Sequence, residues 1–126
     1  MRFMRAVVLT LIFAGFAVAA CEDEPSRGAG TLTVTLRSPH PQEGGARIWL
    51  VGPGMISASA IEGEVHARVR GDTMGVLVVQ PDAGVLRFAL EVQDTTRKPR
   101  GALVQVVGPD NEVRPALLGY SVEVVR

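Results

Sequence analysis

The sequence predicts an all-β fold, an antiparallel β-sandwich of about eight strands, over residues 31–126. Short runs alternate apolar and polar residues with a period of two, which is the pattern of a strand with one buried face. Breaks that contain Gly and Pro separate these runs at the spacing usual for sandwiches and barrels, and no useful window has a helical period. The length of 126 residues fits one domain once a removable N-terminus is subtracted.

The first predicted strand, TLTVTLRS, covers residues 31–38 and places Leu32, Val34 and Leu36 on its buried face. The run EVHARVR at 64–70 places positions 65, 67 and 69 inward and the intervening His and Arg residues outward. The run VLRFALEV at 85–92 alternates in the same way. The other predicted strands are 47–51, 57–61, 73–80, 102–107 and 120–125.

The inward positions of these strands predict a single hydrophobic core. For the strand at 47–51 the sequence leaves open whether Trp49 or its two neighbours face inward. The predicted core residues are Leu32, Val34, Trp49 or Ile48 and Leu50, Val69, Leu86, Phe88, Leu90, Val104, Val122 and Val124.

The stretch from Met74 to Val79 is almost continuously apolar. We expect an interior strand that is covered on both sides. If the strand is uncovered, the same composition predicts an interface, because monomers seldom expose such a surface without a use.

Turn-forming residues mark several connections. Gly71 and Asp72 predict a hairpin turn between two strands. Asp110, Asn111 and Glu112 favour a turn built on Asx side chains, with a calcium site as the alternative.

The N-terminus has the features of a targeting segment. Arg2 and Arg5 precede an almost wholly apolar stretch of 15 residues, 6–20, which is short for a membrane-crossing helix and typical of a signal-peptide core. The small residues Val18, Ala19 and Ala20 lie directly before Cys21, the only cysteine in the chain.

This arrangement resembles the lipobox of bacterial lipoproteins over residues 1–21. The resemblance implies recognition of Val18, Ala19 and Ala20 by the lipoprotein signal peptidase, cleavage before Cys21, and lipid (palmitate and related acyl chains) on the Cys21 sulfur. A thiolate is the nucleophile that such a transfer needs, and the chain has no second cysteine to consume it. An ordinary secretory signal cut after Ala20 and an uncleaved anchor are the alternatives.

Three segments follow from this interpretation: a signal peptide at 1–20, a lipidated Cys21 with a flexible linker to residue 30, and the β-domain at 31–126. The linker, EDEPSRGAG, is polar and contains Pro and Gly without apolar periodicity. The expected location is the cell envelope, with the domain facing the periplasm or the exterior, on either the inner or the outer membrane.

The β-domain is similar in outline to cohesin-type and related carbohydrate-binding β-sandwiches of bacterial surface proteins. An Ig-like sandwich would show much the same pattern of strands. The similarity lies in the order of strands, including GDTMGVLVVQPDAGVLRFALEV, two apolar strands joined by a Pro-Asp-Ala-Gly turn, and the return GALVQVVGPDNEVRPALLGYSVEV. It implies a binding role and assigns no binding residue.

Charge and motifs exclude several functions. Lys plus Arg and Asp plus Glu are both 13, so the chain lacks the basic excess of nucleic-acid binders, and we expect no nucleic-acid partner. A metal site at His40 and His66 would need the fold to bring the two together and a third ligand that the sequence does not identify, and no catalytic motif or cofactor is predicted. We therefore expect a binding or assembly module with an unknown protein or carbohydrate partner. A small enzyme or metal-dependent carrier whose site forms only in three dimensions, and a purely structural lipoprotein, are the alternatives.

Overall fold

The computed structural model describes residues 28–126, and over this range the chain forms eight strands and no helix. All eight predicted strands are present, with the first beginning at Gly30. The strands are β1 (Gly30–Arg37), β2 (Glu43–Val51), β3 (Met55–Ala60), β4 (Glu64–Arg70), β5 (Thr73–Gly84), β6 (Arg87–Val92), β7 (Arg100–Val107) and β8 (Ser121–Val125).

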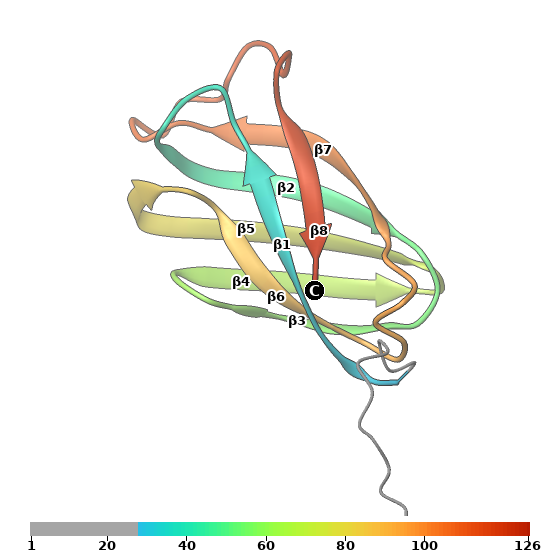
Figure 1. Ribbon diagram of the computed structural model, residues 1–126. Coiled ribbons are helices and arrows are strands. Elements are labelled where there is room, and N and C mark those ends of the chain that lie inside the picture. The colour runs from blue at the N-terminus through green and yellow to red at the C-terminus, as the bar shows by residue number, and fades with distance from the viewer. Residues whose placement is uncertain (1–27) are drawn as a thin grey trace, which may run out of the picture.

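The strands form two antiparallel four-stranded sheets that pack face to face. The first sheet has the order β3-β6-β1-β8, and the second has the order β4-β5-β2-β7. The strands of the first sheet cross those of the second, and the chain passes repeatedly between the layers (Figure 1). The predicted all-β sandwich is therefore confirmed.

Strand pairing in the second sheet is centred on β5 and β2, which each have a partner on both sides. The β4–β5 hairpin pairs Arg70 with Thr73, so Gly71 and Asp72 form its two-residue turn as predicted. Gly71 has a φ of +61°, a conformation that glycine adopts without steric cost.

The core lies between the sheets and consists of the inward positions of six strands and of Leu86. Phe88 on β6 and Leu32 on β1 are fully buried against Ile48 and Leu50 of the opposite sheet. Val122 and Val124 are partly buried and pack against this core. The predictions for these residues, and for Val34, Leu86 and Leu90, are confirmed.

Two predicted core positions are wrong, since Val69 is 40% and Val104 42% exposed. Of the two possibilities for the strand at 47–51, burial of the neighbours of Trp49 is confirmed, and Trp49 itself is 46% exposed. Ile48 and Leu50 take the inward positions of β2, which leaves Trp49 outside. Val69 lies on β4, an edge strand of the second sheet, where most side chains are exposed.

Val104 is displaced by an irregularity in strand pairing. The β2–β7 register pairs Arg47 with Gln105 and Ile48 with Leu103, so Val104 is the extra residue of a β-bulge. Leu103 packs against the core and Val106 is fully buried. The bulge thus breaks the simple alternation from which the inward position of Val104 was predicted.

The apolar strand β5 is interior within its sheet but covered on one face only. Met74, Val76 and Val78 are buried, whereas Leu77 is 40% and Val79 38% exposed. The expectation of cover on both sides is wrong, and the strand meets the condition under which the sequence predicts an interface.

The predicted Pro-Asp-Ala-Gly turn is also wrong. β5 continues to Gly84, which pairs with Glu43 across a bulge, and β5 and β6 belong to different sheets. The two apolar strands are therefore joined by a connection between layers at residues 85–86, and they do not form a hairpin.

Candidate functional site

The strand register of the second sheet aligns a set of cationic, aromatic and small residues on its outer face. Arg68 on β4 pairs with Gly75 on β5, and Gly75 pairs with Trp49 on β2. Two residues further along β5, on the same face, Leu77 pairs with His66 on β4 and with Arg47 on β2. Two neighbouring rows therefore cross the sheet in the orders Arg68-Gly75-Trp49 and His66-Leu77-Arg47.

Gly75 makes a gap in the middle of this face. It has no side chain, and a Cβ atom built there would meet only the Trp49 ring, at 3.8 and 3.9 Å. The indole of Trp49 therefore lies beside Gly75, at van der Waals distance from the position that a Cβ would take. The result is a floor of backbone with an aromatic ring at one side.

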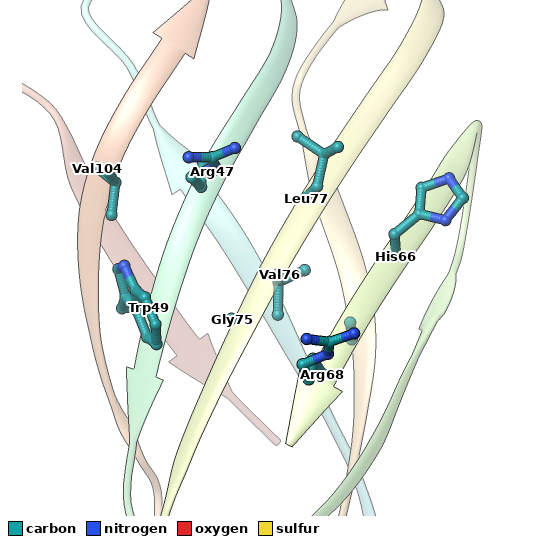
Figure 2. A pocket seen from close by; sticks show the side chains of 9 residues that line it. Arg47, Trp49, His66, Arg68, Gly75, Val76, Leu77 and Val104 are labelled. Carbon is teal, nitrogen blue, oxygen red and sulfur yellow. The ribbon is translucent and has the colours of Figure 1, made fainter. Parts of the chain in front are cut away.

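The gap belongs to a groove of about 410 Å³. We call it the basic groove. Arg47 and Trp49 on β2 lie on one side of β5, and His66 and Arg68 on β4 lie on the other (Figure 2). The groove is lined by Arg47, Trp49, His66, Ala67, Arg68, Gly75, Val76, Leu77 and Val104.

A second hollow continues the basic groove towards the β4–β5 turn. It has a volume of about 640 Å³, and it shares Arg47, Trp49, Arg68 and Gly75 with the first while adding Arg70 and Thr73. The two hollows together form an elongated depression along β5.

Positive charge on the walls of the basic groove is uncompensated. Within residues 28–126, Arg47, Arg68 and Arg70 make no ion pair, and all three side chains are exposed. Glu64, at the start of β4, is an acidic neighbour, and its Oε1 is 3.2 Å from His66 Nε2. An anion entering the groove would therefore meet three free guanidinium groups.

A second polar cluster surrounds the carboxylate of Glu43, which is only 1% exposed. The Ser38 hydroxyl donates a hydrogen bond of 2.6 Å to Oε2, and Tyr120 donates its hydroxyl to the same oxygen. Arg114 donates to Oε1 through Nε at 3.0 Å and through a terminal nitrogen at 2.9 Å. Both oxygens of the buried carboxylate are therefore satisfied.

The Glu43 cluster is electrostatically fixed. Burial alone would raise the pKa of Glu43, but the hydrogen bonds from Ser38, Tyr120 and Arg114 outweigh it and lower the pKa below its ordinary value. Burial, followed by the bond to Glu43, raises the pKa of the Tyr120 hydroxyl. The cluster ties the β7–β8 connection to the start of β2, which indicates a structural role.

The two histidines that the sequence offered as ligands line different cavities. His66 lines the basic groove, whereas His40 lines a hollow beside Glu43 and its ring centroid lies 6.1 Å from that of Tyr120. No cluster of three or more His, Cys, Asp or Glu side chains that could hold a metal ion occurs within residues 28–126.

The turn at 108–112 has the Asx geometry that the sequence favoured. The Asp110 carboxylate accepts a hydrogen bond from the Glu112 amide at 3.2 Å, and Asn111 adopts a φ of +70°. These contacts account for the polar residues of this loop as turn formers.

The predicted lipidation residue Cys21 and the predicted recognition residues Val18, Ala19 and Ala20 lie outside the described residues. In the part of the chain that is described, no helix is both long and apolar enough to cross a membrane.

Comparison with known proteins gives no relative: no protein-family model, curated protein or solved structure matches this chain.

Sequence reasoning did not identify the basic groove. Arg47, Trp49, Arg68 and Gly75 are separated by up to 28 residues, and only the strand register brings them together. One indication was available in the alternation of the strands. Arg47 and Trp49 are two residues apart and so lie on the same face of their strand, and the arginines of 64–70 were predicted to face outward on another strand.

Proposed function

We propose that this chain is a lipid-anchored protein of the cell envelope whose β-sandwich acts as a binding or assembly module. The basic groove is its binding surface. The observation that carries this proposal is the half-exposed Trp49, which lies beside the unpaired Arg47 on β2 and faces the unpaired Arg68 on β4 across a floor that Gly75 leaves open.

The composition of the outer face supports a binding role. Trp49, Leu77, Val79 and Val104 leave between 38% and 46% of their surface exposed on three adjacent strands. Exposed apolar surface of this kind marks interaction sites, and Trp and Arg are the residues most enriched in them. No packing requirement of the core explains an indole at this position.

The membrane anchor rests on the sequence of residues 1–21. Two or three acyl chains suffice for stable anchoring, because burial of each methylene contributes about 0.8 kcal/mol and one chain alone is marginal. Labelled palmitate should enter the wild-type protein and not the Cys21→Ser variant, which should accumulate as the uncleaved precursor. An unlabelled wild-type protein that begins at an unmodified Cys21 in the soluble fraction would replace anchoring with ordinary secretion.

The binding surface can be tested in cells with a photo-crosslinking amino acid placed at position 77. Leu77 lies on the groove wall and is 40% exposed, so the probe faces any occupant. The matched control is position 91, an exposed residue on β6 of the other sheet. We expect adducts with an envelope component from position 77 and none from position 91. Equal yields from both positions, or none from position 77, would refute the groove as the binding surface.

A further inference from the structure

We propose that the occupant of the basic groove is an acidic glycan, a linear oligosaccharide whose sugar rings carry carboxylate groups. This inference rests on the proposed function and names the class of ligand that the same groove takes.

The charge on the groove walls selects an anion. Arg47 lies on one wall, and Arg68 and Arg70 lie on the other, and none of them is paired within the described range. A guanidinium group presents a planar fork of N–H donors that matches a carboxylate with two parallel hydrogen bonds. Arg68 and Arg70 are two residues apart on β4, so their Cα atoms are about 6.8 Å apart along one wall. A ligand with repeated carboxylates can therefore use more than one of these forks.

Trp49 selects a ligand with rings. The apolar C–H face of a pyranose ring packs on the face of an indole, and its hydroxyl groups remain free for polar contacts. The missing side chain at Gly75 lets such a ring approach the sheet beside Trp49. A volume of about 410 Å³ lies within the range of small-ligand pockets, and the adjoining hollow extends it in one direction.

The shape and chemistry of the groove disfavour the other anions. An extended acidic peptide commonly binds by adding a strand to a free sheet edge, but the floor strand β5 is already paired on both sides. A single-stranded nucleic acid stacks successive bases on several aromatic rings, whereas Trp49 is the one indole of the chain.

A second copy of the chain and a membrane surface also fit the basic groove poorly. A second copy packed on this face through a twofold axis would bring Arg47, Arg68 and Arg70 against the same residues of its partner. A membrane surface meets projecting side chains, whereas Gly75 is a recessed floor.

Titration of the full chain in neutral detergent tests the proposal directly. Because Trp49 is the only tryptophan, its fluorescence reports occupancy of the groove. The probes are polygalacturonate, alginate and hyaluronate, three carboxylated glycans with different linkages. The matched control probe for each glycan is its methyl ester, which keeps the rings and neutralises the carboxylates. A thymidine oligonucleotide and anionic phospholipid vesicles test the competing anions.

We expect at least one carboxylated glycan to change Trp49 fluorescence and its methyl ester to bind at least about tenfold more weakly, because charge-assisted hydrogen bonds are lost. The Arg68→Gln variant should bind that glycan about tenfold more weakly or worse by calorimetry. Gly75→Val should fill the floor and abolish binding, and circular dichroism and thermal melting should show that its fold is retained. Arg37→Gln removes the same charge from β1 of the other sheet, and its affinity should stay within about twofold.

The proposal is overturned if none of the three glycans binds, if the ester binds equally well, or if the oligonucleotide or the vesicles bind as tightly as the best glycan. Equal loss of affinity in Arg37→Gln would also overturn it, because binding would then follow net charge. A protein adduct at position 77 together with no glycan binding would refute the glycan and leave the binding module intact. Absence of any position-77 adduct would instead refute the proposed function itself.

Discussion

Tyr120 donates its hydroxyl hydrogen bond to the buried carboxylate of Glu43, a residue 77 positions earlier in the chain. Because a hydrogen bond to a charged group contributes about 1.5–3 kcal/mol, the Tyr120→Phe variant should lose that much free energy of unfolding in a denaturant titration. Arg37→Gln, which removes an exposed ion pair with Glu123, should cost less than about 1 kcal/mol. Equal losses in the two variants would show that the Tyr120 bond contributes no more to stability than an exposed ion pair.

The Glu43 carboxylate should make stability sensitive to acid. Its pKa is lowered in the folded state, so the unfolded state takes up the proton first as the pH falls. The stabilisation is therefore fully present above about pH 4.5, the ordinary value for glutamic acid, and is lost as the pH falls through the folded-state pKa.

The Glu43→Gln variant isolates this effect, because it cannot titrate at that position. The difference in unfolding free energy between wild type and variant should be constant at neutral pH and should shrink below about pH 4.5. A difference that stays constant throughout an acid series of denaturant titrations would contradict the lowered pKa.

Phe88 is fully buried in the centre of the core, whereas Val104 lies on a bulge and is 42% exposed. Phe88→Ala should lower the free energy of unfolding by about 3–5 kcal/mol, because it removes buried apolar surface and leaves a cavity. Val104→Ala should change it by no more than about 0.5 kcal/mol. A large loss in Val104→Ala would mean that the outer face of the second sheet is covered in solution.

The stability of the fold does not require a glycine at position 75. A Cβ there makes only ordinary contact with Trp49, so Gly75→Ala should raise the free energy of unfolding by about 0.4–1 kcal/mol. Gly63→Ala is the contrasting variant, because Gly63 has a φ of +73° and a Cβ would overlap the Val79 carbonyl oxygen. That variant should be destabilised in the same thermal-melting series. If Gly75→Ala is also destabilised, the open floor is part of the fold's own packing.

The strands and most of the core could be predicted because alternation is a local property. Leu32, Val34 and Leu36 show their common face within five residues of sequence, and β1 buries all three. Val104 could not be predicted because the bulge depends on how β7 pairs with β2, which is set by contacts between distant segments. Val69 follows the same logic, since its exposure results from the edge position of β4.

The candidate site was harder to predict from the sequence than the fold. The outward position of Arg68 follows from the alternation of its strand, but its proximity to Trp49 requires the register of β5 with both of its neighbours, β4 and β2. The Glu43 cluster is more remote, because Ser38, Arg114 and Tyr120 reach it from both ends of the domain. Neither the basic groove nor the Glu43 cluster has a sequence motif from which it could have been predicted.

The position of β1 also determines how the domain responds to mechanical tension. β1 begins at Gly30 and is hydrogen-bonded to β6 on one side and to β8 on the other. A pull transmitted through the preceding residues along the strand axis loads both ladders in shear, so many hydrogen bonds resist together and none is peeled away singly. The basic groove lies on the other sheet, so a pull applied at this end of β1 enters the domain through strands that do not line the groove.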